Sequence, residues 1–310
     1  MTLAVAAPKL ISRPRGLVIA ARPATLLASL GPVLVGTAIG MKSAGTVTIS
    51  GVATFFATAL AAALMQAGAN LVNDVKDFER GVDDDQRVGP PRMTQSGLVS
   101  ATDVRYAYRW VFAAALVIGV LLALKAGPLI FVLGAASVTV AYMYTAGPFP
   151  LSYHGLGEVA ALVFFGPVAV AGSAYLQFST WDWRACEWGF GPGLIAASMM
   201  AINNYRDRAT DSKAGKRTLA LLVGEELARR LPFMALVAAW SLLAAYGIDS
   251  GAAAMGAIFG LGGIALVRGT VRPLLIDDAR SLNVALKRTA KFHPAFAVAF
   301  AVLTVIGRMN

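Results

Sequence analysis

Long, uncharged, apolar stretches are the feature of this sequence that most limits how the chain can fold. Residues 43–73, for example, contain no Asp, Glu, Lys or Arg. A helix that crosses a bilayer needs about 20 predominantly apolar residues, and several stretches of this chain reach that length. Charged residues make up only 14% of the chain, whereas soluble domains carry roughly 25%. The sequence therefore predicts an all-α protein that crosses a membrane several times.

We expect about nine transmembrane helices packed in one bundle, with residues 1–310 forming a single transmembrane domain. The predicted spans are 17–41, 48–72, 107–124, 128–145, 158–178, 189–205, 231–247, 251–267 and 292–308. The first 16 residues contain no apolar segment followed by a small-residue cleavage site. A cleaved signal peptide is therefore not expected, and the first span should remain in the protein.

The basic residues divide unequally between the two sides of the predicted bundle. With nine spans and the N-terminus inside, 23 of the 27 Lys and Arg residues fall on one side. Cytoplasmic loops carry an excess of Lys and Arg, so we expect this side to face the cytoplasm across the cell (inner) membrane. The anionic lipid of that surface accounts for most of the net charge of +10. No nucleic-acid partner is expected.

Two acidic segments on the basic side share the same spacing. One contains Asn73 and Asp77, the other contains Asn203, Asp207 and Asp211, and the equivalent positions are 130 residues apart. On a helix, residues four apart lie on one face with their Cβ atoms roughly 5–6 Å apart. The shared spacing is a weak internal repeat, and it predicts two acidic faces on the same side of the membrane.

Carboxylates that gather at a membrane interface repel one another unless cations neutralise them. Mg²⁺ prefers oxygen ligands, and it is usually held by one or two carboxylates together with phosphate oxygens of a substrate. We therefore predict a site in which Mg²⁺ bridges a diphosphate to Asp77, Asp83, Asp207 and Asp211. The cations predicted to meet the remaining phosphate charge are Lys216, Arg217 and Arg92. The alternative, that both acidic segments are only solvated surface, stays open.

Four motifs resemble the UbiA superfamily of membrane prenyltransferases. They are residues 70–77 running to Gly81-x-Asp83, residues 87–97, residues 144–148 with 155–158, and residues 203–220. Arg22-Pro23 before the first span is also similar to that family, so the resemblance covers nearly the whole chain. The Gly81-x-Asp83 form and the Gly155-Leu-Gly-Glu158 run favour the branch that prenylates 1,4-dihydroxy-2-naphthoate. The pair Pro90-Pro91 departs from the family's single proline, but it lies outside the acidic positions.

The resemblance implies nine transmembrane helices and two aspartate-rich motifs that bind a Mg²⁺–polyprenyl diphosphate complex. It implies transfer of the polyprenyl group to an aromatic acid acceptor. With 1,4-dihydroxy-2-naphthoate the attacked carbon bears the carboxylate, so CO₂ leaves and demethylmenaquinol forms, a step of menaquinone biosynthesis. The isoprenoid tail would leave the protein through an opening toward the lipid bilayer.

The resemblance also implies roles for individual side chains. Lys216, Arg217 and Arg92 would stabilise the leaving diphosphate, and the ring of Tyr144 would stabilise the allylic cation. The side chains that would help to hold the Mg²⁺–diphosphate complex are Asn73, Asn203 and Arg22.

Three other interpretations remain open from the sequence. The same class of enzyme acts on other acceptors, such as 4-hydroxybenzoate or homogentisate. The internal repeat is also typical of secondary transporters, although those proteins place their coupling sites near the bilayer midplane. The acidic residues here gather instead at one end of the predicted helices. A non-catalytic membrane scaffold is the third alternative.

Overall fold

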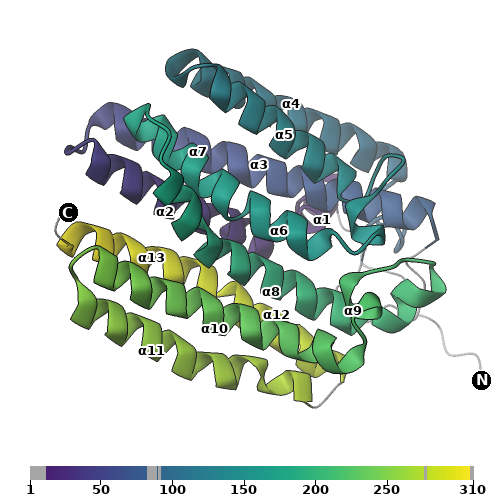
Figure 1. Ribbon diagram of the computed structural model, residues 1–310. Coiled ribbons are helices and arrows are strands. Elements are labelled where there is room, and N and C mark those ends of the chain that lie inside the picture. Colours follow the sequence, from purple (N-terminus) through teal and green to yellow (C-terminus); the bar gives the residue numbers. More distant parts are fainter. Residues whose placement is uncertain (1–11, 82–88, 90–91, 276–277, 308–310) are drawn as a thin grey trace, which may run out of the picture.

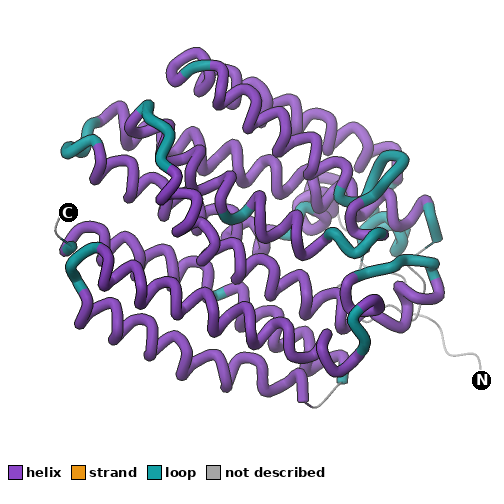
Figure 2. The backbone as a smooth tube through the Cα atoms, viewed as in Figure 1, coloured by secondary structure: helices purple, strands orange, loops and turns teal. Residues whose placement is uncertain are grey.

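The computed structural model describes residues 12–81, 89, 92–275 and 278–307, and every regular element within them is helical. The predicted all-α bundle is therefore confirmed (Figure 2). The long helices run side by side along the bundle (Figure 1). The first half of the chain forms α1 (Arg13–Ala20), α2 (Pro23–Ser43), α3 (Ile49–Glu79), α4 (Ala101–Ala126), α5 (Pro128–Met143), η1 (Leu151–Tyr153) and α6 (Gly157–Phe164). The second half forms α7 (Pro167–Phe178), α8 (Trp183–Lys213), α9 (Leu219–Leu222), α10 (Glu225–Asp249), α11 (Ala253–Val271), η2 (Arg272–Leu275), α12 (Ala279–Ala290) and α13 (Phe292–Ile306).

Each predicted span corresponds to a helix or to a pair of consecutive helices. Among the described residues, seven helical segments are long and apolar enough to cross a membrane, and α5 is a shorter apolar helix. Helix α8 is not among the seven because its second half is polar, but its 31 residues extend about 46 Å. The protein is therefore a multi-pass membrane protein.

Two predicted spans are interrupted, and a proline explains each break. The first span divides at Arg22, which has a left-handed backbone with φ of 54° and precedes Pro23. The span 158–178 divides at Gly166, before Pro167. A residue that precedes proline is pushed out of the helical region, so each proline begins a new helix instead of continuing the old one.

The helices that carry the acidic residues extend beyond the predicted spans. Helix α3 continues to Glu79 and α8 to Lys213, so the second halves of both sequence motifs are helical. The region 268–291, which we expected to be a loop, contains the amphipathic helix α12. Leu282 and Ala285 are buried there, whereas Lys287 is exposed. Hydropathy marks where apolar surface ends, and these helices continue into polar sequence.

Two of the cations predicted for the opposite side, Lys42 and Arg184, lie at the other end of the bundle, whereas a third, Arg308, lies outside the described residues. The Lys42 Nζ donates to the carbonyl oxygen of Gly307 over 3.3 Å, beyond the C-terminal end of α13. Arg184, at the start of α8, forms an ion pair with Asp249 at the end of α10. The structure thus separates these residues from the acidic ends of α3 and α8, as the charge distribution predicts.

Small residues allow α10 and α11 to approach closely. An added Cβ at Gly256 would lie 2.5 Å from the Cα of Gly247, whereas one at Gly262 on the same helix would meet nothing within 4 Å. In a bilayer the association of helices depends on such close packing, because lipid chains are as apolar as the side chains. The Gly247–Gly256 contact therefore fixes the distance between these two helices.

We expect Gly256→Leu to destabilise the folded protein by about 1–3 kcal/mol, because the new side chain must push α10 and α11 apart. The measurement is the midpoint of thermal unfolding in detergent. Gly262→Leu is the matched control, and its midpoint should stay near that of the unchanged protein. Equal midpoints for the two variants would contradict the assigned contact.

Candidate active site

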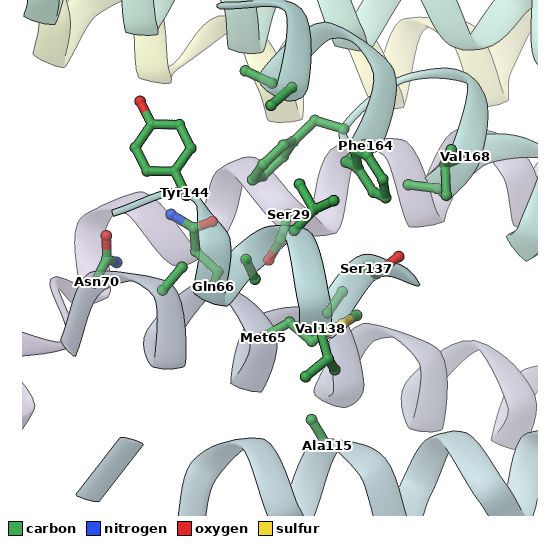
Figure 3. A pocket seen from close by; sticks show the side chains of 18 of the residues that line it. Ser29, Met65, Gln66, Asn70, Ala115, Ser137, Val138, Tyr144, Phe164 and Val168 are labelled. Atoms are coloured by element: carbon green, nitrogen blue, oxygen red, sulfur yellow. The ribbon is translucent and has the colours of Figure 1, made fainter. Parts of the chain in front are cut away.

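One cavity of about 330 Å³ lies among helices α2 to α8. Its charged lining gathers at the end where α3 and α8 carry their carboxylates. Figure 3 shows Asn70, Gln66 and Tyr144 on one side of the cavity and the apolar side chains of Phe164 and Val168 on the other. The charged and amide side chains that line it are Arg22, Gln66, Asn70, Asn73, Asp77, Arg92, Asn203, Asn204, Asp207, Asp211 and Lys216. The cavity is therefore amphipathic, with a charged end and an apolar remainder.

Helical periodicity brings the predicted residues to this cavity. On α8 the lining positions are 200, 203, 204, 207, 210 and 211, and on α3 they include 62, 65, 66, 69, 70, 73 and 77. These spacings of three and four residues describe one face of each helix. The two acidic faces predicted from the sequence consequently meet across the same space.

Asp77 is the most enclosed of the three carboxylates that line the cavity, with 2% of its surface exposed. The Nη2 of Arg92 donates to its Oδ2 over 3.0 Å, and both side chains are buried. The Tyr153 hydroxyl donates to its Oδ1 over 3.2 Å. A buried polar group is tolerated only when it is paired and hydrogen-bonded, and these contacts offset the cost of burying Asp77.

Lys216 joins the two acidic motifs. Its Nζ lies 3.2 Å from the Oδ1 of Asp211 and 3.6 Å from the Oδ1 of Asp77. Burial favours the neutral amine, but the charges of Asp77 and Asp211 outweigh that effect and raise the pKa of Lys216 above its ordinary value. Because the pKa is raised, Lys216 keeps its positive charge throughout the neutral range.

The chain returns Lys216 to the site through the turn that ends α8. Gly215 adopts a φ of +71°, which a residue with a side chain rarely adopts. The Lys216 N–H then donates to the Asp211 carbonyl oxygen and the Gly215 N–H to the Ser212 carbonyl oxygen. This pair of bonds is a Schellman motif, and it places the side chains of Asp211 and Lys216 together.

Asp207 is held by the preceding residue. Arg206 donates from Nε to one carboxylate oxygen of Asp207 over 2.7 Å and from Nη2 to the other over 2.6 Å. The same guanidinium reaches Asn203 and Asn283, which links the site to α12. Such a bidentate pair fixes both the position and the plane of the carboxylate.

Asp74 has a structural part in the site. Its carboxylate accepts hydrogen bonds from the N–H groups of Met93 and Thr94 and from the Thr94 hydroxyl. These bonds tie the segment after residue 91 to α3. Arg92, the adjacent residue, is thereby brought to Asp77.

Tyr144, Asn73 and Arg22 also reach the cavity. The Tyr144 hydroxyl donates to the Met200 sulfur, and the Asn73 amide donates to the Thr145 hydroxyl over 2.9 Å. The bend that carries Arg22 is secured by Asn70, whose amide donates to the Ala21 carbonyl oxygen. The sequence-predicted residues thus converge on one space from α2, α3, α8 and the connecting segments.

One predicted residue, Arg217, is not brought into the site. Arg217 has an exposed side chain outside the cavity lining, and its backbone N–H donates to the Tyr153 carbonyl oxygen. Asp83 lies outside the described residues. In the part of the chain that the structure describes, no three Asp, Glu, His or Cys side chains are arranged to hold a metal ion by themselves.

Sequence reasoning missed several side chains that shape the site. Tyr153 contacts Asp77, and its ring lies 4.9 Å from the Lys216 nitrogen. Asn204 lines the cavity and donates to Glu158 on α6. No spacing in the sequence relates these residues, because each pair comes from different helices or loops.

The transmembrane helical bundle encloses a cavity that is charged at one end and apolar elsewhere, and this lining is complementary to a molecule with an anionic head and an apolar chain. The arrangement indicates an integral membrane enzyme. The sequence profile of the UbiA prenyltransferase family matches residues 29–290. The chain belongs to this family, and it is a membrane-bound prenyltransferase.

Relatives and solved structures agree with this assignment. A protein of Mycobacterium tuberculosis named 1,4-dihydroxy-2-naphthoate octaprenyltransferase is 38% identical over 211 residues, which are 68% of this chain and 70% of the relative. An Escherichia coli protein of the same name is 30% identical over 91% of this chain and 92% of its own. The fold is similar to that of a UbiA homologue from Aeropyrum pernix K1, with a TM-score of 0.68, 15% identity and coverage of 91% of this chain and 97% of the other. A homologue from Archaeoglobus fulgidus bound to DMAPP and Mg²⁺ has a TM-score of 0.61 at 18% identity, covering 94% of this chain and 99% of the other.

Proposed function

We propose that this protein transfers a polyprenyl group from polyprenyl diphosphate to 1,4-dihydroxy-2-naphthoate, with loss of CO₂, and so forms demethylmenaquinol for menaquinone biosynthesis. The relatives that are named for this reaction support the choice of acceptor. The excess of basic residues on the side of the site supports a location in the cell membrane with the site facing the cytoplasm.

The observation that carries the proposal is the charged end of the cavity. Arg92 and Lys216 stand beside Asp77 and Asp211, and the remaining lining is largely apolar. An isoprenoid diphosphate has the matching form, because its head is anionic and its chain is apolar. The cations would contact phosphate oxygens, and the apolar walls would hold the first isoprene units.

Mg²⁺ fits this donor set in the manner usual for phosphate enzymes. Asp77, Asp207 and Asp211 face one cavity and are each paired with a cation. They would hold Mg²⁺ together with the diphosphate oxygens, so the three carboxylates do not need to lie close enough together to bind an ion by themselves. Bound Mg²⁺ would stabilise the negative charge that develops on the diphosphate.

The residues of the site would then promote ionisation of the prenyl diphosphate. The bond between the first prenyl carbon and the diphosphate oxygen breaks, and the electron pair leaves with the diphosphate. Lys216 and Arg92 are preorganised cations near those oxygens, where such groups contribute most. The ring of Tyr144, on the cavity wall, would face the allylic cation and exclude water from it.

The acceptor would complete the reaction without a further cofactor. The ring carbon that carries the carboxylate donates an electron pair to the allylic cation, and a carbon–carbon bond forms. The bond to the carboxylate then breaks, CO₂ leaves, and its electron pair restores the aromatic ring.

The apolar chain has a route toward lipid. Cavity-lining residues on α4 and α5 include Leu116 and Phe131, which are 41% and 51% exposed on the surface of the bundle. In a bilayer that surface faces acyl chains. The distal isoprene units would therefore lie against lipid, so that a long tail does not need to fit inside 330 Å³.

The purified protein, given Mg²⁺ and a polyprenyl diphosphate, is expected to convert 1,4-dihydroxy-2-naphthoate and to release one CO₂ for each prenyl group transferred. The loss follows from attack at the carboxylated carbon. The measurement is product mass together with the fate of a label in the carboxyl carbon, with 4-hydroxybenzoate and homogentisate as competing acceptors.

Label retained in a prenylated product would contradict decarboxylative transfer. Use of 4-hydroxybenzoate in place of the naphthoate would move the protein to another branch of the family. Release of diphosphate also distinguishes the enzyme from a transporter, because transport alone leaves the prenyl diphosphate intact.

A further inference from the structure

A buried carboxylate behind the cavity wall has no part in the reaction derived above. Glu158 lies in the first turn of α6 with 7% of its surface exposed. Its Oε1 accepts a hydrogen bond of 2.8 Å from the Asn204 amide, whereas its Oε2 is buried without a partner among the described residues. Burying a carboxylate with so few partners costs free energy. The contact that Glu158 makes with Asn204 therefore indicates its role.

The contact orients Asn204. The Asn204 Nδ2 donates to the Glu158 Oε1, so the NH₂ group of the Asn204 amide, and not its oxygen, faces Glu158. The Asn204 oxygen is then directed away from Glu158. Asn204 lines the cavity, and no side chain or backbone group of the described residues donates to that oxygen. The cavity wall therefore presents a fixed hydrogen-bond acceptor.

The position of this acceptor is next to the charged end of the cavity. Asn204 shares one face of α8 with Met200 and Asp207, and all three line the cavity. The Tyr144 hydroxyl, which donates to the Met200 sulfur, closes the same part of the wall. A ring bound here would lie beside the prenyl carbon that leaves the diphosphate.

We propose that the Asn204 oxygen accepts a hydrogen bond from a phenolic hydroxyl of the aromatic acceptor, and that Glu158 is the positioning residue that fixes its orientation. This assignment rests on the proposed function, since it needs a hydroxylated aromatic substrate. It gives the site a preference for acceptors that carry a hydroxyl donor. An apolar wall at this place would bind a hydroxyl and its methyl ether with similar affinity.

The test compares binding of 1,4-dihydroxy-2-naphthoate with binding of its two monomethyl ethers, measured as inhibition constants against prenyl transfer or as dissociation constants. The unchanged protein is expected to bind one of the two ethers about tenfold more weakly than the acid, because that ether lacks the donor. In Asn204→Leu the affinity for the acid should fall about tenfold and this discrimination should disappear. The KM for prenyl diphosphate should stay within about twofold.

Asn204→Leu leaves the buried Glu158 carboxyl group without its hydrogen-bond partner and risks misfolding. The double variant Glu158→Gln/Asn204→Leu replaces that carboxyl group by a neutral amide and should lose the discrimination equally. Glu225→Gln is the matched control, since Glu225 also lies in the first turn of a helix but is exposed. If the folded variants still distinguish acid from ether as the unchanged protein does, the assignment is overturned. If the unchanged protein prenylates no aromatic acid, it is the proposed function that fails.

Discussion

Asp211→Asn is expected to reduce prenyl transfer more than about tenfold while leaving the thermal unfolding midpoint nearly unchanged. Asp211 lies near the end of α8, where Lys216 is its ion-pair partner, and Asn keeps its shape while removing its charge. The fold should tolerate the change, although the pair is buried, because Lys216 keeps Asp77 as a second carboxylate partner. The loss follows because an amide oxygen binds Mg²⁺ more weakly than a carboxylate does and no longer holds Lys216 in place. Turnover at saturating substrates, over a range of Mg²⁺ concentrations, is the measurement.

Asp249→Asn supplies the control for this experiment. Asp249 is also the acidic partner of a cation at a helix end, but it pairs with Arg184 at the opposite end of the bundle. Its replacement should leave turnover near that of the unchanged protein. Near-normal activity of a folded Asp211→Asn variant would remove this carboxylate from the metal site.

Replacement of Asp77 would test the metal site less directly, because it is expected to change the stability of the fold as well as the activity. The place of Asp77 at the end of a predicted span, away from the lipid-packed core, suggests that its replacement leaves the fold intact. In the structure Asp77 is buried and is the partner of Arg92, which is itself 4% exposed. Removing one member of a buried pair leaves the other charge uncompensated. A loss of activity in Asp77→Asn would therefore combine a metal effect with displacement of Arg92.

Much of the fold can be predicted from the sequence because lipid imposes a simple constraint. Each span must be apolar and helical, so hydropathy locates it. What hydropathy does not locate is a helix that continues into polar sequence, as α3 and α8 do, or an amphipathic helix such as α12. The breaks at Arg22 and Gly166 are visible as X-Pro pairs, but the bend that each produces depends on packing.

The candidate site likewise has a part that can be predicted from the sequence and a part that cannot. The repeated Asn-x3-Asp spacing predicts which faces of α3 and α8 meet, because spacing within a helix is a local property. Partners across helices are not local. Nothing in the sequence pairs Glu158 with Asn204, or Tyr153 with Asp77, and the difference between Lys216 and its neighbour Arg217 depends on the turn at Gly215.

Lys216→Gln is expected to lower kcat/KM for prenyl diphosphate by about 100-fold, with a much smaller rise in the KM for the aromatic acid. Lys216 is the cation between Asp77 and Asp211, and its raised pKa keeps it charged at neutral pH. Without it the two carboxylates repel each other and the anionic head loses a preorganised partner. Initial rates with each substrate varied in turn provide the measurement.

Lys213→Gln is the matched control, because Lys213 is an exposed lysine of the same helix end that does not line the cavity. If Lys216 acted only by attracting anionic lipid, both variants would change activity to the same small extent. Equal losses for the two substrates in Lys216→Gln would indicate general damage to the fold instead of a diphosphate contact. A loss of kcat/KM for prenyl diphosphate, with the KM for the aromatic acid nearly unchanged, would distinguish a diphosphate contact of Lys216 from both alternatives. Only a group that contacts the diphosphate changes the kinetic constants of one substrate and spares those of the other.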